Sequence, residues 1–288
     1  MARLTRRGHR LAVAVAIASV CAVSAAGAGA DDRLSVSAGL DVTTAYFFRG
    51  LLRERHGLIV QPSAEIRTTL YRAGEYEVGK DGPVSSVGLV LGTWNSIHSQ
   101  SDTGTFHETD AYGGVSFGLF DTLDLAFSYV AYVSPDDSFD TIQELDVTLA
   151  LDDVEWLGPL ALRPQVTLAH EFDGRAFGPE RGTYLQLGIQ PSFELLPGDR
   201  YPVSLILPVV AGFSVGDYYE TFAHHDEIWG FTSVGAVTSV PLAFLGETHG
   251  VWSASLGAHV YTFNDNLETI NDDDDPWVVG MAGLSVAY

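Results

Sequence analysis

The stretch LSVSAGLDVTTAYFF, residues Leu34–Phe48, decides the fold. Every second residue from Leu34 onward is apolar or threonine, whereas the residues between them begin with Ser35, Ser37 and Asp41. Because successive side chains of a strand point to opposite sides, this segment has one apolar face and one polar face. It spans 15 residues, far more than the usual ~5–6 of a strand in a globular sheet.

The first thirty residues have the features of a secretory signal peptide. A basic head with Arg3, Arg6, Arg7 and Arg10 precedes an apolar stretch from Leu11 to about Val23, and Ala28-Gly29-Ala30 has the form of a cleavage site. The apolar stretch is too short for a ~20-residue membrane helix. We expect residues 1–30 to be a signal peptide and residues 31–288 to be one domain; the alternatives are an uncleaved anchor and a lipoprotein attached through Cys21.

Charge and cysteine content exclude several classes of protein. Residues 31–288 hold 11 basic and 37 acidic side chains, a net charge of −26, and no cysteine. Disulfide and thiolate chemistry are therefore absent from this domain, and nucleic acid is disfavoured because its phosphates require basic side chains. An exported acidic chain is typical of a cell-surface protein that attracts cations.

Eleven further strands are predicted from the same alternation, and no connection has the 3.6-residue apolar period of a helix. They cover residues 58–71, 84–96, 105–119, 123–133, 139–151, 158–171, 183–195, 201–215, 227–240, 250–263 and 277–288. Long polar connections alternate with shorter turns, as in a barrel with external loops at one rim and periplasmic turns at the other. The long segment 72–83 departs from this pattern. An even number of strands places both termini on the periplasmic side.

The apolar face of each strand meets either lipid or a protein core, and alternation alone does not distinguish them. A soluble sandwich or lipocalin-like barrel turns its apolar side inward. Predicted strands of 11–15 residues favour lipid, because they can cross a bilayer at a tilt of ~45°. Aromatic residues at the strand ends also favour lipid, since such rings prefer the membrane interface. The sequence therefore predicts an all-β fold, a closed antiparallel transmembrane β-barrel of about 12 strands with short periplasmic turns and longer acidic external loops.

If the apolar side chains face outward, the alternate positions line the lumen. These positions hold nine acids and two arginines: Asp41, Glu65, Arg67, Glu108, Asp110, Asp124, Glu144, Asp146, Arg163, Glu171 and Glu194. Charges facing lipid would cost about 2–4 kcal/mol each at mid-depth. The apolar positions carry no such charges, which supports this orientation. A carboxylate-rich lumen favours cations and predicts a narrow cation-preferring channel. The alternative is a plugged interior, because twelve strands lie between the ~8 of a filled barrel and the ~16 of a wide channel.

Three polar clusters in the predicted loops have weaker functional interpretations. Asp272–Asp275 resembles a calcium-binding run but lacks the glycine and glutamate of a helix-loop-helix motif, so a solvated loop sharing divalent ions with lipopolysaccharide is favoured. His224-His225-Asp226 has the residue types of a metal site or a general base, but no second carboxylate pair can be placed opposite it. Arg49, Arg53 and Arg55 are most simply a surface cluster with no special role; the alternatives are that they bind lipopolysaccharide phosphates or fold inward as a basic constriction.

No enzyme is predicted, and neither is a metal site or a cofactor. An outer-membrane phospholipase needs Ser and His together near the lipid interface. The adjacent pair His98-Ser99 lies in a predicted loop and has no placed acidic or amide partner.

The stretch DVTTAYFFRG, from Asp41 to Gly50, resembles the start of the TorF-type porins, as does the following Gln61-Pro62. In that family a strand just after the signal peptide ends in a Thr-x-x-Tyr-x-Phe-Arg-Gly-like sequence, matched here by Thr43, Tyr46, Phe48, Arg49 and Gly50. The resemblance implies an outer-membrane barrel with a transport role and supplies no catalytic residues.

As a strand end, this motif is expected to place Tyr46 and Phe48 in the outer aromatic girdle, with Arg49-Gly50 turning the chain at the rim. Family members often continue with polar residues. This chain instead has Leu51-Leu52, which indicates that its first loop packs differently.

Together these features predict a porin-like channel in the outer membrane of a Gram-negative-type cell, for passive diffusion or uptake of small solutes, with a preference for cations. The alternative is a non-conducting structural or adhesion barrel whose acidic loops bind divalent ions or partners. The apolar alternation that ends at Tyr288 resembles the signal read by the outer-membrane assembly machinery. The expected partners are membrane lipid, lipopolysaccharide, small solutes and that machinery.

Overall fold

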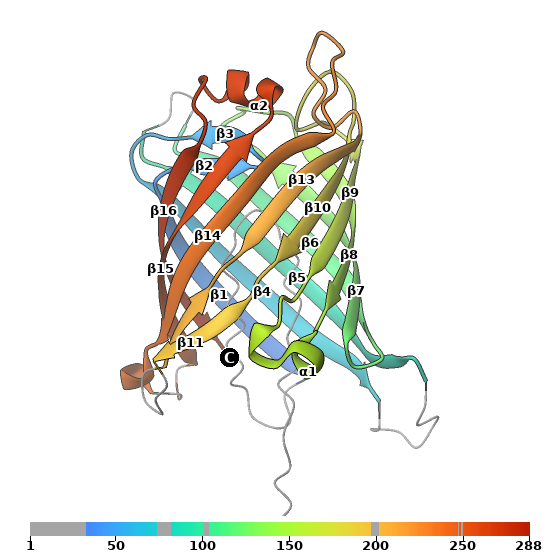
Figure 1. Cartoon of the computed structure of the whole chain (residues 1–288), viewed down its shortest axis with the longest axis vertical. Coiled ribbons are helices and arrows are strands. Elements are labelled where there is room, and N and C mark those ends of the chain that lie inside the picture. The colour runs from blue at the N-terminus through green and yellow to red at the C-terminus, as the bar shows by residue number, and fades with distance from the viewer. Residues whose placement is uncertain (1–32, 74–81, 101–103, 197–201, 247, 249) are drawn as a thin grey trace, which may run out of the picture.

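The chain forms a closed antiparallel β-barrel with twelve wall strands (Figure 1). The computed structural model describes residues 33–288 apart from 74–81, 101–103, 197–201, 247 and 249, so the predicted signal peptide lies outside the described residues. The wall closes because β1 (Leu34–Thr43) pairs antiparallel both with β4 (Ile59–Arg72) and with the last strand, β16 (Trp277–Ala287). The predicted fold class is confirmed.

The other wall strands pair with their neighbours along the chain. They are β5 (Val84–His98), β6 (Phe106–Leu119), β7 (Leu123–Val133), β8 (Ile142–Leu151), β9 (Gln165–Asp173), β10 (Thr183–Ile189) continued by β11 (Ser192–Leu196), β12 (Val203–Ile206) continued by β13 (Val209–Gly216), β14 (Trp229–Pro241) and β15 (Val251–Phe263). Two crossings that were predicted as continuous are interrupted, at Pro191 and at Pro208. Proline has no N–H to donate to the ladder, which accounts for both interruptions.

The two rims of the barrel differ in structure. At the terminal rim β1 begins and β16 ends, beside α1 (Val154–Leu157) and the 3₁₀ turns η1 (Gly158–Leu160) and η2 (Ala243–Leu245). The opposite end, here the loop rim, carries α2 (Asp265–Ile270) (Figure 1). None of the helices in the described part of the chain is long and apolar enough to cross a membrane.

The segment between β8 and β9 differs from its prediction. A strand was predicted over residues 158–171, but β9 begins only at Gln165. The preceding residues form a compact turn closed by Asp153, whose two carboxylate oxygens accept hydrogen bonds from the backbone N–H groups of Leu162 and Arg163, both at 3.0 Å. Arg163 therefore lies in this turn with a positive φ of 49°.

The outer face of the wall is apolar and the inner face is polar. The exposed large apolar side chains on the wall strands include Leu34, Val36, Leu40, Ile66, Leu91, Leu145, Leu149, Leu168, Leu256 and Leu284. The alternate positions are buried, and many of them are polar, including Gln61, Ser128, Thr148, Thr167 and Ser233. The apolar stripes therefore face lipid, as the sequence predicted.

Candidate functional site

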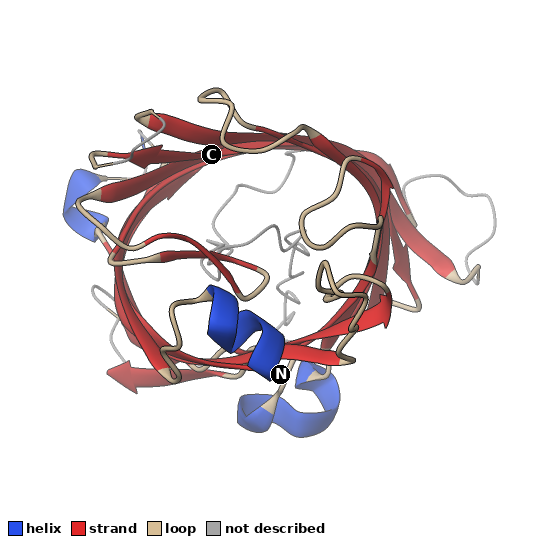
Figure 2. Ribbon diagram, turned by 90° about the horizontal axis from the view of Figure 1, so that it is seen from above, coloured by secondary structure: helices blue, strands red, loops and turns tan. Residues whose placement is uncertain are grey.

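A short hairpin inside the barrel is the main feature of the loop-rim half. It consists of β2 (Tyr46–Phe48) and β3 (Leu51–Glu54), which pair with each other and with no wall strand (Figure 2). The chain leaves the wall after Thr43, whose hydroxyl donates to the carbonyl of Ala45 at 2.8 Å. We call residues 46–54 the inner hairpin.

The turn of the inner hairpin is the two-residue sequence Arg49-Gly50. Both residues have positive φ values, 48° and 88°. Positive φ at both central positions is what the type I′ turn of a tight hairpin requires, and glycine is the residue that adopts it most readily. The turn therefore reverses the chain inside the barrel and not at the rim, and it carries the Arg49 side chain in the lumen.

The two faces of β2 pack against opposite sides of the lumen. Tyr46 contacts Trp94 with ring centroids 5.2 Å apart, and Phe48 contacts Tyr132 at 5.1 Å. On the other face Phe47 stacks on Tyr261 at 4.9 Å. The expectation that Tyr46 and Phe48 lie in an outer aromatic girdle is wrong, because both side chains are buried inside the barrel.

Two apolar clusters result, one on each side of the inner hairpin. The first cluster contains Tyr46, Phe48, Ile59, Val90, Trp94, Tyr112, Val130, Tyr132 and Ile142. The second cluster contains Ala45, Phe47, Ala169, Tyr184, Tyr218, Tyr219, Phe231, Phe263, Leu267 and Val279. Several aromatic residues that were expected at the lipid interface thus pack inward.

Arg49 is held by a carboxylate on the far wall. Its Nη1 and Nη2 atoms donate to Oε1 and Oε2 of Glu144, each at 2.7 Å. Tyr132 donates its hydroxyl to Oε2 of the same carboxylate at 3.0 Å. Such parallel, charge-assisted bonds are the strongest arrangement that a guanidinium makes.

Aromatic rings complete the surroundings of the Arg49 guanidinium. Its central carbon lies 4.3 Å from the ring centroid of Tyr184, and Nη1 donates to the hydroxyl of Tyr218 at 3.0 Å. Burial lowers the pKa of Arg49, but the neighbouring Glu144 carboxylate and tyrosine hydroxyls together raise the pKa by more than burial lowers it, so the net shift is upward. Burial raises the pKa of Tyr218 despite the opposing effect of Arg49, so its hydroxyl stays protonated at neutral pH.

The last loop fastens the inner hairpin in place. Asn271 donates from Nδ2 to the carbonyl of Gly50 at 2.8 Å and accepts from the N–H of Leu52 at 2.9 Å. Tyr219 donates its hydroxyl to the carbonyl of Arg49 at 3.0 Å. Leu51 and Leu52, the departure noted from the TorF-type pattern, pack against the second cluster.

Five of the predicted lumen acids surround the inner hairpin in buried positions: Glu108, Asp110, Glu144, Asp146 and Glu171. Glu108 accepts the hydroxyl proton of Tyr46 at 2.8 Å. Glu171 accepts the N–H groups of Ala176 and Gly182 at 2.7 and 2.8 Å, so it orders the loop after its own strand.

Asp110 and Asp146 are the other two buried acids near the inner hairpin. Asp110 is fully buried, and its carboxyl group contacts that of Glu108 through a side-chain hydrogen bond. Oδ1 of Asp146 is buried without a partner in the described part of the chain. Buried carboxylates are costly without a partner, so the unpartnered oxygen of Asp146 indicates that the lumen accepts additional positive charge.

The other predicted lumen residues lie apart from the hairpin. Glu65 pairs with Arg67 and accepts the hydroxyl proton of Tyr112 at 3.0 Å. Asp41 is opposite Gln61 and Gly283, and Asp124 is opposite Gly118 and Ala150. Glu194 is opposite Ser204 in the β11–β12 ladder, near the terminal rim. Arg163 lies in the turn before β9, where it donates to the carbonyl of Gln190 at 3.4 Å.

Two histidines lie beside the end of the inner hairpin. The rings of His98 and His107 stack with centroids 4.6 Å apart, and His98 Nε2 is 2.8 Å from the hydroxyl of Ser96. Asp136 Oδ2 lies 3.5 Å from His107 Nδ1, and Glu54 Oε2 lies 3.8 Å from His98 Nδ1, beyond hydrogen-bond distance. Ser96 is also fully buried, so we base no hydrolytic activity on this group.

The clusters predicted in the loops are engaged locally. Arg55 pairs with Asp272 at 2.9 Å, and His224 Nδ1 contacts Glu220 Oε1 at 2.8 Å. Among the described residues, no group of three or more His, Cys, Asp or Glu side chains is placed to hold a metal ion. Among the interpretations of the first-loop arginines, inward folding is the one that fits Arg49, because its side chain is buried against Glu144.

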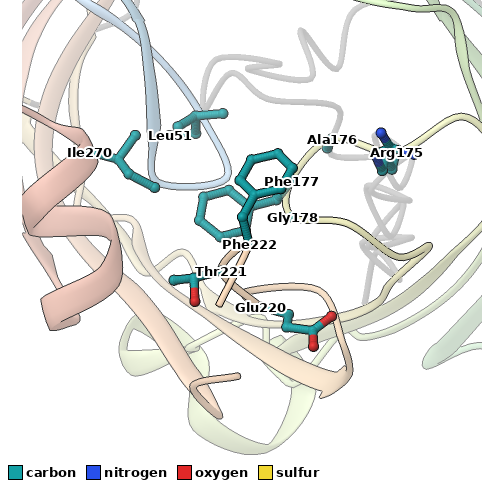
Figure 3. Close-up of a pocket in the computed structure, with 9 residues that line it drawn as sticks. All are labelled: Leu51, Arg175, Ala176, Phe177, Gly178, Glu220, Thr221, Phe222 and Ile270. Atoms are coloured by element: carbon teal, nitrogen blue, oxygen red, sulfur yellow. The ribbon is translucent and has the colours of Figure 1, made fainter. Parts of the chain in front are cut away.

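A separate hollow of about 310 Å³ lies at the loop rim (Figure 3). Phe177, Phe222 and Ile270 of α2 are among the side chains that line it. Its lining is Leu51, Arg175, Ala176, Phe177, Gly178, Glu220, Thr221, Phe222 and Ile270. It is mainly apolar, and the carboxylates around Arg49 are not part of it.

Comparison with known proteins adds the following. No family model matches the chain, and no curated protein matches it in sequence. The NanC porin is 10% identical, with 88% of this chain and 98% of that chain covered and a TM-score of 0.41. The translocator domain of the autotransporter NalP from Neisseria meningitidis is 13% identical, covering 90% and 89%, with a TM-score of 0.42. Outer membrane phospholipase A from Escherichia coli is 13% identical, covering 87% and 92%, with a TM-score of 0.41.

At these identities and TM-scores the likeness carries no argument about activity. The assignment of the chain to the outer-membrane type of β-barrel rests on its own strand pairing, its apolar exterior and its polar lumen.

The residues around Arg49 were only partly accessible to sequence reasoning. Glu144 was predicted in the lumen, but Tyr184 and Asn271 were not singled out. The available signal was the pair of apolar runs on either side of Arg49-Gly50, since two short strands separated by two residues indicate a hairpin.

Proposed function

We propose that the protein is an outer-membrane, porin-like channel for passive diffusion or uptake of small solutes, with a preference for cations. The loop rim is then external and the terminal rim periplasmic. The observation that carries the proposal is the sign of the lumen charge: five buried acids surround the inner hairpin, and among the described residues only Arg49 forms an ion pair with any of them. A lumen field of this sign attracts cations and repels anions.

The inner hairpin sets the width of this channel. It lies within the barrel at the loop rim (Figure 2), and both of its faces are packed against side chains from the wall. In the proposed channel, passage is therefore restricted to small solutes. The resemblance of residues 41–50 to the TorF-type porins is in keeping with a transport role, and the apolar alternation that ends at Tyr288 is in keeping with insertion by the outer-membrane assembly machinery.

A second candidate is a non-conducting structural or adhesion barrel. The two apolar clusters favour it, because together with the inner hairpin they pack the loop-rim half of the interior. The acidic last loop would then bind divalent ions, lipopolysaccharide or partner proteins. The two candidates differ in one measurable property, which is ion conductance.

The test is reconstitution of the mature protein in a planar bilayer with a KCl gradient. We expect small, discrete conductance steps and a reversal potential of the sign that indicates cation selectivity. The double variant Asp41→Asn/Glu194→Gln, which removes two predicted lumen acids outside the buried group around the inner hairpin, should move the reversal potential toward zero. The matched control is Glu155→Gln, which removes an acid exposed on α1 and should leave it unchanged.

Anion selectivity would overturn the cation preference. The non-conducting candidate is tested with a variant in which residues 46–54 are replaced by a short glycine-serine linker. A barrel that conducts neither with nor without the inner hairpin would exclude the channel and support the structural role.

A further inference from the structure

The surroundings of Arg49 have the composition of a receptor for a guanidinium group. The receptor is built by elements other than the hairpin that carries Arg49: Glu144 lies in β8, Tyr184 in β10 and Tyr218 in the loop after β13. Glu144 supplies both carboxylate oxygens at 2.7 Å, and Tyr218 supplies a hydroxyl oxygen at 3.0 Å. The Tyr184 ring covers one side at 4.3 Å.

This geometry selects a guanidinium over other cations. A carboxylate that accepts two parallel N–H bonds matches the planar fork of a guanidinium, whereas an ammonium presents a compact point charge. A guanidinium also stacks on an aromatic ring, as the close approach to Tyr184 shows. The site is therefore specific in shape as well as in charge.

The negative charge at the site exceeds what Arg49 neutralises. Asp146 lies two residues from Glu144 on the same face of β8, so both carboxylates project into the lumen. Asp110, on the neighbouring side of the lumen, is fully buried. Oδ1 of Asp146 is buried without a hydrogen-bond partner among the described residues, which points to a ligand with a second positive charge.

We propose that this group, Glu144 with Tyr132, Tyr184 and Tyr218, is a binding site for guanidinium-bearing solutes in the lumen, and that Arg49 fills it as a tethered occupant. The inference rests on the proposed channel function and names the class of solute. A solute passing through the barrel competes with Arg49 for Glu144, and its second positive charge is matched by Asp146. A dication such as agmatine meets both requirements.

The test uses the variant Arg49→Ala, which vacates the site while the backbone contacts of Asn271 to the hairpin remain available. Agmatine binding to the folded protein in detergent is measured by calorimetry. We expect Arg49→Ala to bind agmatine at least tenfold more tightly than the wild type. N-(4-aminobutyl)urea, which keeps the ammonium but replaces the guanidinium by a neutral urea, should lose this advantage.

The matched variant is Arg49→Ala/Glu144→Gln, which should bind agmatine no better than the wild type. Equal binding by Arg49→Ala with and without Glu144→Gln, or no binding by a folded Arg49→Ala protein, would overturn the proposal. Should Arg49→Ala not fold, Arg49→Lys keeps the charge but loses the fork, and agmatine must then still bind more tightly to it than to the wild type.

Binding in detergent does not depend on conduction, so the two proposals fail separately. A protein that binds agmatine only when Arg49 is removed, yet conducts no ions, would exclude the channel and retain the site. A conducting protein whose Arg49→Ala variant ignores agmatine would retain the channel and exclude the site.

Discussion

Arg49 in the inner hairpin and Glu144 in β8 form a two-point ion pair although 95 residues separate them in the sequence. Both side chains are largely withdrawn from solvent, with exposed fractions of 11% and 0%. Removing two charges from water is costly, and this cost is offset only when the geometry is good and the remaining hydrogen bonds are made. The tyrosine hydroxyls around the pair meet that condition.

The first prediction concerns the energy of this pair. Glu144→Gln leaves the Arg49 charge buried without its counter-ion, so we expect the free energy of unfolding to fall by roughly 3–5 kcal/mol. The double variant Arg49→Met/Glu144→Leu removes both charges and should recover most of that loss. Urea unfolding in lipid vesicles, followed by tryptophan fluorescence, measures both. A double variant that loses as much free energy of unfolding as Glu144→Gln, or more, would contradict the coupling of the two charges.

The second prediction concerns Gly50. A Cβ added there would lie 2.9 Å from Cδ1 of Leu267 and 3.0 Å from Cβ of Phe231, and the residue has a φ of 88°. Gly50→Ala should therefore cost roughly 1–2 kcal/mol for the backbone and about 1–3 kcal/mol more for the overpacking. Gly246→Ala is the matched control, because its φ is 71° and nothing lies within 4 Å. Equal destabilisation of the two variants would show that the packing around Gly50 does not matter.

The third prediction concerns Asn271. Asn271→Ala removes two hydrogen bonds to the inner hairpin and leaves buried backbone groups unpaired, a cost of about 1–3 kcal/mol for each. We expect the Leu52 amide to exchange with deuterium at least tenfold faster, measured by mass spectrometry of peptides from the hairpin. Asn266→Ala is the control, because Asn266 donates to Tyr219 and His225 instead of to the hairpin. Unchanged exchange in Asn271→Ala would remove the anchoring role.

The fourth prediction is a pH dependence at the terminal rim. Burial raises the pKa of the Asp153 carboxyl. The hydrogen bonds from the backbone N–H groups of Arg163 and Leu162, with the charge of Arg163, lower this pKa by more than burial raises it, so the net shift is downward. A carboxyl with a lowered folded-state pKa contributes stability that is complete above its ordinary value of 3.8 and is lost as the pH falls through the folded value.

The stability difference between the wild type and Asp153→Asn should therefore be largest near pH 6 and shrink as the pH drops below 3.8. Urea midpoints at a series of pH values measure this. A difference that stays constant with pH would show that the charge of Asp153 is not involved.

The wall of the barrel was predictable because the side-chain period of a strand is coupled to its surroundings. Once strand length and aromatic placement assign an apolar stripe such as Leu34, Val36 and Leu40 to lipid, the alternate positions have to face inward, whatever their detailed contacts. The same rule identified Glu144 as a lumen residue. It did not require knowledge of any partner of Glu144.

The interior was less predictable, because the same alternation also continues into the hairpin. Tyr46 and Phe48 keep the pattern of the preceding strand, yet the chain has already left the wall after Thr43. The inner hairpin is buried on both faces, so its sequence resembles that of a wall strand. Its ion pair joins residues far apart in the chain, which local pattern does not reveal.

The position of β2 between two dissimilar walls restricts how the segment before it can change in length. Tyr46 reaches Glu108 on one side, while Phe47 stacks on Tyr261 on the other. Inserting or deleting a single residue after Thr43 would rotate the strand by half a turn, bringing Phe47 to the carboxylates and Tyr46 to the rings. Homologous barrels with this hairpin should therefore differ here by an even number of residues or by none.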